Sequence, residues 1–216
     1  MKHVARKRFG QNFLHDNNVI RRIVSSIAPQ KDDLIIEIGP GQAALTTPLQ
    51  QSGAELHLIE LDRDLVSRLE VQFADAGNVT IHSLDALKAD LPAITGGRKC
   101  RLVGNLPYNI STPLIFHLLQ WNLLLTDMHF MLQKEVVERM AAAPGSRTYG
   151  RLSVMTQFRC QVIPLFDVQP GSFSPAPKVC SSIVCLKPLS RPPADAGSIE
   201  KLNSVVTAAF SMRRKT

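Results

Sequence analysis

The chain of 216 residues is poor in aromatic side chains and cysteines and has no long hydrophobic run. Its four cysteines show no CxxC spacing, so we expect reduced core residues and no disulfide framework. No apolar run approaches about 18 residues, which excludes a membrane-spanning helix. The basic N-terminus is not followed by an apolar segment, so we expect it not to be a secretory signal. These absences favour a cytoplasmic protein.

Metal-site and nucleophile patterns are also missing. The six histidines do not have the spacing that metal ligands show, and no Ser-His-Asp arrangement can be inferred. The sequence therefore predicts no metal ion, and it predicts surface or core packing for the histidines.

Positive charge is in excess and is unevenly distributed. The net charge is +7, with +6 in residues 1–31, −7 in residues 32–138 and +8 in residues 139–216. Basic flanks suit a polyanion, and an acidic middle suits a smaller ligand. A solvated basic surface is the alternative that charge alone leaves open.

Strand-like and helix-like segments alternate through the middle of the chain. Short apolar runs predict strands at 34–38, 56–60, 79–83, 101–104 and 127–132. Helical patterns cover 19–27, 43–51, 64–73, 113–121 and 134–142. This alternation predicts an α/β fold, an open sheet with helices on both faces. The later segments indicate further strands at 152–160 and 179–186, a linker at 188–197 and a helix from 198.

Candidate binding residues close four of these strands, namely Gly39, Glu60, Asp85 and Asn105. Ligands of open α/β sheets bind at the carboxyl ends of the strands. Gly39 opens a Gly-Pro-Gly turn whose backbone can approach a ligand, and Glu60 can hold ribose hydroxyls. Asp85 can accept from an adenine amine. A tight turn, a solvated acid and a helix N-cap are the respective structural alternatives.

The sharpest signal is the segment Asn105-Leu106-Pro107-Tyr108. Pro107 favours an extended Leu106, so the Leu106 carbonyl and the Asn105 amide oxygen can point the same way and accept from one NH₂ group. Tyr108 offers an aromatic plane on which a base can stack. A plain X-Pro turn at a strand end is the alternative.

Four separated motifs resemble the ribosomal RNA adenine N6-dimethyltransferase family, most closely its bacterial small-subunit branch. They are RKRFGQNFL at 6–14, EIGPG at 37–41, NLPYNIS at 105–111 and FSPAPKV at 173–179. The resemblance covers essentially the whole chain. It implies a Rossmann-like S-adenosylmethionine-dependent methyltransferase domain at 1–187 and a linker at 188–197. Residues 198–216 would begin a small helical RNA-positioning domain that is otherwise largely absent.

The resemblance also implies a reaction and its residues. Two adjacent adenosines in a hairpin near the 3′ end of small-subunit (16S) rRNA would be dimethylated at N6, on an immature 30S subunit. The enzyme would be a monomer without DNA or membrane partners. The implied cofactor residues are Asn12, Leu14, Gly39, Glu60, Asp85 and Asn105. The implied catalytic residues are Asn105, Leu106, Pro107, Tyr108 and Phe173, with Tyr108 and Phe173 enclosing the flipped base. For Phe173, a core aromatic is the alternative.

One substitution departs from the family pattern, because Ala43 stands where many relatives have glycine. We expect alanine to be tolerated there if its φ is negative. Three other readings stay open: a large-subunit rRNA methyltransferase of the macrolide-resistance type, a non-catalytic ribosome-assembly factor, and an NAD-dependent dehydrogenase. The last rests only on the weak glycine match.

Overall fold

The computed structural model describes residues 10–211. Six basic residues of the two positively charged flanks lie outside these residues: Arg6, Lys7, Arg8, Arg213, Arg214 and Lys215.

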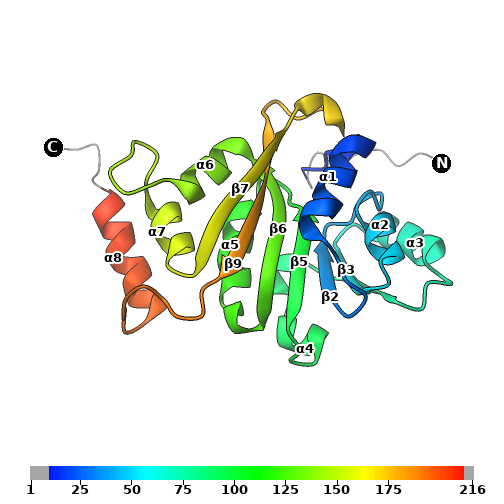
Figure 1. Cartoon of the computed structure of the whole chain (residues 1–216), viewed down its shortest axis with the longest axis horizontal. Helices are drawn as coiled ribbons and strands as arrows, with labels where there is room; N and C mark the ends of the chain where they lie inside the picture. The colour runs from blue at the N-terminus through cyan, green and yellow to red at the C-terminus, as the bar shows by residue number, and fades with distance from the viewer. Residues whose placement is uncertain (1–9, 212–216) are drawn as a thin grey trace.

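A seven-stranded sheet runs through the molecule (Figure 1). In spatial order its strands are β4 (Val79–Ser83), β3 (Glu55–Glu60), β2 (Leu34–Ile38), β5 (Cys100–Asn105), β6 (Leu125–Gln133), β9 (Ser181–Pro188) and β7 (Cys160–Val168). The strands from β4 to β6 pair in parallel, whereas β9 is antiparallel to both β6 and β7. The amino end of β9 therefore lies at the edge where the parallel strands have their carboxyl ends.

Helices cover both faces of the sheet, as the alternation predicts. They are α1 (Asn17–Ile27), α2 (Thr46–Gln51), α3 (Arg63–Gln72), α4 (Leu91–Thr95), α5 (Ser111–Leu119), α6 (Lys134–Ala141), α7 (Arg151–Gln157) and α8 (Ile199–Ser211). Neighbouring strand residues enter two different cores: Ile36 packs with the residues of α5 and α6, and Ile35 packs with those of α1 and α2. The predicted α/β fold with helices on both faces is confirmed.

The prediction of a strand at 152–160 is wrong, because Arg151–Gln157 forms helix α7. Its buried apolar residues Leu152 and Met155 are three apart, which is helical spacing, and the Ser153 hydroxyl accepts from the Gly150 N–H at 3.0 Å. The strand in this region is β7, which contains Pro164. Proline is tolerated there because β7 is an edge strand with an irregular register between Pro164 and Phe166.

The helix predicted at 43–51 is shorter, since α2 begins at Thr46. Ala43 lies in the preceding turn with φ +64°, so the condition of a negative φ, under which alanine was expected to be tolerated, is not met. Ala43 is 2 % exposed and packs with Leu58 and Leu69, which offsets part of the strain of the left-handed conformation.

After β9 the chain continues to α8, which lies beside α7 at one end of the molecule (Figure 1). The contacts that join α8 to the region of α7 include a hydrogen bond from Arg151 to the Asn203 side chain and an edge-on contact between the rings of Tyr149 and Phe210. Within residues 10–211, no helix combines the length and apolar character needed to cross a membrane.

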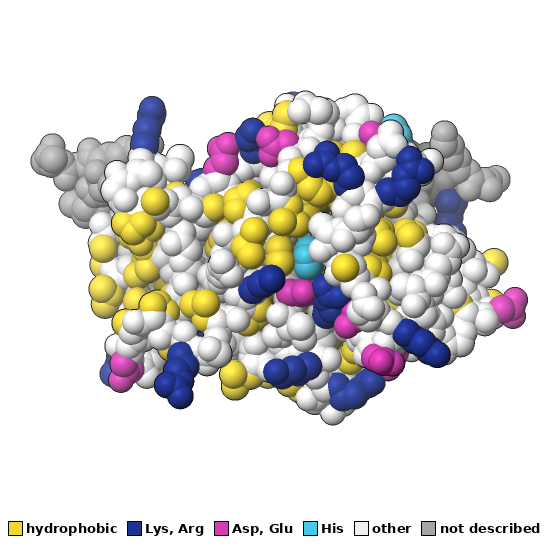
Figure 2. All heavy atoms as spheres, in the orientation of Figure 1, with side chains coloured by type: hydrophobic (Ala, Val, Ile, Leu, Met, Phe, Trp, Pro, Cys, Tyr) yellow, Lys and Arg dark blue, Asp and Glu magenta, His cyan; other side chains and the backbone are white. Residues whose placement is uncertain are grey.

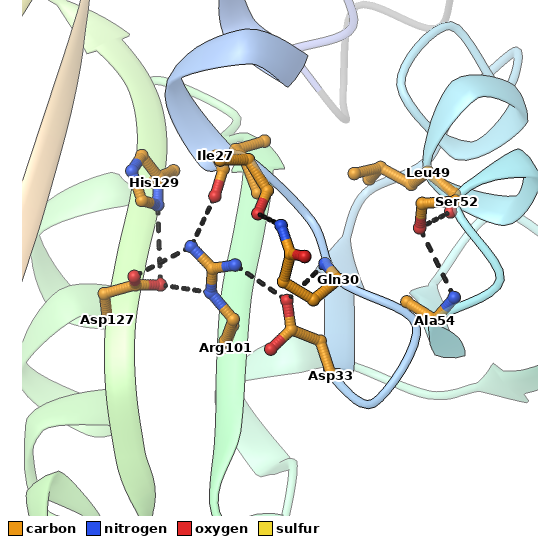
Figure 3. A network of polar contacts seen from close by, with 10 residues as sticks. Ile27, Gln30, Asp33, Leu49, Ser52, Ala54, Arg101, Asp127 and His129 are labelled. Atoms are coloured by element: carbon orange, nitrogen blue, oxygen red, sulfur yellow. Dashed lines mark hydrogen bonds and ion pairs between the residues drawn. The ribbon is translucent and has the colours of Figure 1, made fainter.

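Charged side chains on the surface and in the interior are arranged differently. Lysine and arginine are scattered across the face that Figure 2 shows. In the interior, Arg101 of β5 ties three elements together (Figure 3). It donates to Asp127 of β6 and to Asp33, at 2.9 and 2.8 Å, and to the Ile27 carbonyl at the end of α1, at 2.6 Å. Burial raises the pKa of Asp127, but the ion pair with His129 at 3.5 Å and the hydrogen bonds from Arg101 outweigh it and hold that pKa at about 2.

Candidate functional site

A cavity of about 340 Å³ opens at the carboxyl edge of the parallel strands. The sequence analysis predicted that candidate residues would meet at this edge. The cavity is lined by nine of the predicted site residues: Asn12, Leu14, Gly39, Glu60, Asp85, Asn105, Leu106, Pro107 and Tyr108. Phe173 is the one predicted site residue outside it.

The turn after β2 needs glycine. Gly39 and Gly41 have φ of +68° and +57°, in the left-handed region that side chains disfavour. A Cβ atom at position 41 would also lie 3.2 Å from the Phe13 ring. The Gly39 N–H donates to the Ile59 carbonyl at 2.9 Å and so joins the turn to β3. Main-chain atoms of Gly39 and Gly41, without side chains, therefore line the cavity at the end of β2.

Glu60 ends β3 with a carboxylate that the backbone holds in place. One oxygen accepts from the Leu61 and Asp62 N–H groups at 2.9 Å each, and the other accepts from the Gly41 N–H at 3.3 Å. Burial raises the pKa of Glu60, and these three hydrogen bonds act against that shift. Because a carboxylate can accept about four hydrogen bonds, Glu60 retains capacity for a ligand hydroxyl.

Asp85 follows β4 at the start of a short 3₁₀ helix, Ala86–Lys88. Its Oδ1 accepts from the Leu87 N–H at 3.0 Å, so the N-cap alternative is real. Within residues 10–211, its Oδ2 has no hydrogen-bond partner. One side chain can therefore cap the helix and still present an acceptor to the cavity.

Glu37 is a cavity residue to which the sequence analysis gave no role. It is 2 % exposed near the carboxyl end of β2, and its Oε2 has no hydrogen-bond partner among the described residues. Burial raises its pKa to about 7; the nearby Thr46 hydroxyl offsets part of this shift, and the Glu60 carboxylate adds to it. A charged residue inside the apolar run LIIEI was the signal that could have revealed it.

The electrostatic character of the cavity is acidic. Its described lining contains three carboxyl groups, those of Glu37, Glu60 and Asp85, and no lysine, arginine or histidine. A cavity of this sign attracts cations and disfavours phosphate groups. This balance disfavours the pyrophosphate of NAD and fits a ligand that carries positive charge.

Asn105 ends β5 and connects two walls of the cavity. Its Nδ2 donates one hydrogen to the Asn12 carbonyl at 2.9 Å and so contacts the N-terminal arm, the segment that precedes α1. The Leu106 N–H donates to the Met131 carbonyl at 3.2 Å. Within residues 10–211, neither the Asn105 Oδ1 nor the Leu106 carbonyl accepts a hydrogen bond. Both of the expected acceptors are therefore available to a ligand.

Aromatic residues at the cavity differ from the predicted pair. Tyr108 lines it, with its hydroxyl 2.6 Å from the Ser181 Oγ. Phe173 instead is 3 % exposed and packs in the core beside Leu14, where the two-residue strands β1 (Phe13–Leu14) and β8 (Phe173–Ser174) pair. The core alternative for Phe173 fits this arrangement, and Phe173 is not among the residues that line the cavity. Phe13, which had no predicted role, does line the cavity.

Known proteins are similar to this chain along its whole length. The sequence profile of the family described as ribosomal RNA adenine dimethylase matches residues 2–216. Ribosomal RNA small subunit methyltransferase A from Methylococcus capsulatus is 56% identical over 216 residues, which cover 100% of this chain and 84% of that protein.

Two solved structures share the fold. A dimethyladenosine transferase from Plasmodium falciparum superposes with a TM-score of 0.83 at 29% identity, over 94% of this chain and 72% of its own. The 23S rRNA methyltransferase ErmE superposes with a TM-score of 0.79 at 25% identity, over 95% of this chain and 81% of its own. The Rossmann-like methyltransferase fold implied by the motifs is confirmed.

Proposed function

The chain belongs to the ribosomal RNA adenine dimethylase family, and from this premise we propose that it uses S-adenosylmethionine to dimethylate N6 of two adjacent adenosines near the 3′ end of small-subunit rRNA. The proposal rests on an acidic cavity that opens beside the Asn105–Tyr108 segment. Its described lining contains no lysine, arginine or histidine side chain. The cavity joins a site for a cationic cofactor to a site for a flat base with an amine.

The cavity residues fit this cofactor. S-adenosylmethionine supplies an electrophilic methyl group on a positively charged sulfur when it is bound. Glu60 retains an acceptor for ribose hydroxyls, and Asp85 Oδ2 can accept from the adenine amine. The buried Oε2 of Glu37, which has no hydrogen-bond partner among the described residues, suits positive charge. Gly39 lets the backbone approach the ligand, and the N-terminal arm closes the cavity with Asn12 and Leu14.

The residues of the site contribute to catalysis mainly by orienting the target amine. The N6 amine of adenine is a poor nucleophile, because its lone pair is delocalised into the ring. The Asn105 Oδ1 and the Leu106 carbonyl can each hold one amine hydrogen, which favours a pyramidal nitrogen aimed at the methyl group. Pro107 fixes the extended backbone that this requires, and Tyr108 stacks on the extruded base. No strong base is needed first, so orientation and electrostatics supply most of the rate.

The choice of the small subunit rests on relatedness. The chain is 56% identical to a protein named for the small subunit and 25% identical to one named for 23S rRNA. We assign an immature 30S particle as substrate and a monomeric state, as the family resemblance implies, and we keep the cytoplasmic location that the sequence composition favours. We also keep the division into a catalytic part at 1–187, a linker at 188–197 and an RNA-positioning part from 198.

Two assays test the proposal. Calorimetric titration should give binding of S-adenosylmethionine and none of NAD. Methyl incorporation into small subunits from methylation-deficient cells should place two N6,N6-dimethyladenosines next to each other near the 3′ end of the rRNA. NAD binding would support a dehydrogenase. Cofactor binding without methyl transfer would leave a non-catalytic assembly factor, and methylation of large-subunit rRNA alone would support the macrolide-resistance type.

A further inference from the structure

We infer that Ser181 is a positioning residue for this reaction: its hydroxyl holds the Tyr108 ring against the cavity wall, in the orientation in which a target adenine stacks. The inference rests on the proposed function and deepens it, because it assigns the support of the stacking ring to a residue 73 positions away in sequence.

The contact is a hydrogen bond between two hydroxyl groups. The Tyr108 hydroxyl and the Ser181 Oγ are 2.6 Å apart, within the range of O–H···O bonds. Ser181 is fully buried, with 0 % exposure, and Tyr108 is half-buried. A buried tyrosine hydroxyl needs a partner. Ser181 provides one without adding charge beside the cavity.

The anchor itself is rigid. Ser181 is the first residue of β9 and lies between two strands, opposite Gln133 of β6 and Val168 of β7. Directly before it, the Cys180 carbonyl accepts from the Lys134 N–H at 3.0 Å. The antiparallel direction of β9 brings this residue to the carboxyl edge of the parallel strands. A firm β-sheet position thus supports a ring that stands on an irregular loop.

The ring is held at both ends. The backbone of Tyr108 is held because its carbonyl accepts from the Ser111 hydroxyl at 3.2 Å. The other end of the side chain is held by the hydrogen bond between the Tyr108 hydroxyl and Ser181. A ring that is already oriented loses less freedom when a base stacks on it. The bond should therefore favour productive placement of the adenine and have little effect on the cofactor.

A double-mutant cycle tests this coupling. Ser181→Ala and Tyr108→Phe each remove the bond and keep the aromatic ring. We expect each to lower kcat/KM for rRNA methylation roughly threefold to tenfold, the range of one hydrogen bond. The double variant should lose no more than either single one, while S-adenosylmethionine affinity stays within about twofold of wild type. Ser182→Ala is the matched control, because Ser182 is 3 % exposed on the same strand and donates to the Phe166 carbonyl.

A spectroscopic readout follows the ring without turnover. The chain has only two tyrosines, so 3-fluorotyrosine labelling gives two ¹⁹F resonances, which Tyr149→Phe assigns. Ser181→Ala should shift or broaden the Tyr108 resonance and leave that of Tyr149 unchanged. Ser182→Ala should change neither resonance.

Several outcomes would overturn the inference. Wild-type kcat/KM in folded Ser181→Ala or Tyr108→Phe would do so, as would losses that add in the double variant or an unchanged Tyr108 resonance. If Ser181→Ala does not fold, Tyr108→Phe decides, since it breaks the same bond. A wild-type chain that transfers no methyl group would overturn the proposed function together with this inference. An active wild type with unaffected variants would remove the inference alone.

Discussion

The side-chain amide of Asn105 has two roles, one for its nitrogen and one for its oxygen. Its nitrogen holds the Asn12 carbonyl, and its oxygen is the proposed acceptor for the target amine. Asn105→Ala should lower methyl transfer about 10²-fold or more, as loss of a transition-state contact does. Asn105→Asp keeps an acceptor oxygen and loses the donor, so it should retain more activity than the alanine variant. Single-turnover rates at saturating cofactor measure this. Equal rates in both variants would assign the effect to the arm contact.

Glu37 makes stability depend on pH. Its pKa is about 7 in the folded chain, whereas its ordinary value is 4.5. Between these values the folded state binds more protons than the unfolded state, so stability falls as pH rises through this window. The penalty above pH 7 is of the order of 3 kcal/mol.

Glu37→Gln removes this ionisation. Thermal unfolding of both proteins between pH 4 and 8 should show the variant more stable at pH 8, with a difference that shrinks toward pH 4.5. A stability difference that does not vary with pH would contradict an ionisation at this position. Comparison with wild type at each pH cancels the contributions of the other carboxyl groups.

At the scale of elements, two alanines with left-handed backbones end or precede helices. Ala28 caps the end of α1 with φ +47° and is exposed, while Ala43 has φ +64° and a buried methyl group. Glycine relieves the strain at both positions. Ala28→Gly should stabilise the chain by about 0.5 kcal/mol, net of glycine's larger unfolded-state entropy.

Ala43→Gly should be neutral or destabilising, because it also loses about 0.8 kcal/mol of methyl burial. The denaturant concentrations at the unfolding midpoints of the two variants measure this difference, provided that the m value, the dependence of the unfolding free energy on denaturant, is unchanged. Equal stabilisation by both would show that the contact of the Ala43 methyl with Leu58 and Leu69 contributes nothing.

Prediction from sequence succeeded for the elements whose signals are local. The run LIIEI followed by Gly39-Pro40-Gly41 has the pattern of a buried parallel strand and a turn, and β2 spans the same five residues. Residues 152–160 were wrongly predicted as a strand, since a seven-residue helix is too short for a strong period and the edge strand that follows it contains Pro164. The order of β9 and β7 depends on long-range pairing that no local pattern encodes.

The same division holds for the site. Residues at strand ends could be found because the fold class brings strand ends together. Ser181 could not, since its place depends on the antiparallel insertion of β9 between β6 and β7. Phe173 lay in a motif of the right kind, but its burial depends on the pairing of β8 with the N-terminal arm. The motifs predicted the type of reaction, whereas tertiary contacts determine which side chains line the cavity.

At the scale of the whole molecule, charge separates two binding events. The cavity is acidic, whereas residues 1–31 and 139–216 carry the positive charge. Cofactor binding releases no condensed counterions, so its affinity should change less than about twofold between 50 and 200 mM salt, as for contacts sheltered from screening. RNA binding exchanges phosphate counterions for lysine and arginine, so its affinity should fall steeply over the same range.

The N-terminal basic cluster provides the sharpest test of this separation. Alanine at Arg6, Lys7 and Arg8 together should flatten the logarithmic salt dependence of RNA affinity by about one unit for each lost phosphate contact. Alanine at Arg63, Lys88 and Lys99, three exposed residues of the acidic middle, removes the same charge and is the matched control. If both triple variants change the slope equally, net charge alone attracts the RNA. If only the N-terminal variant does, its arm contacts phosphate directly while the adjoining Asn12 and Leu14 serve the cofactor.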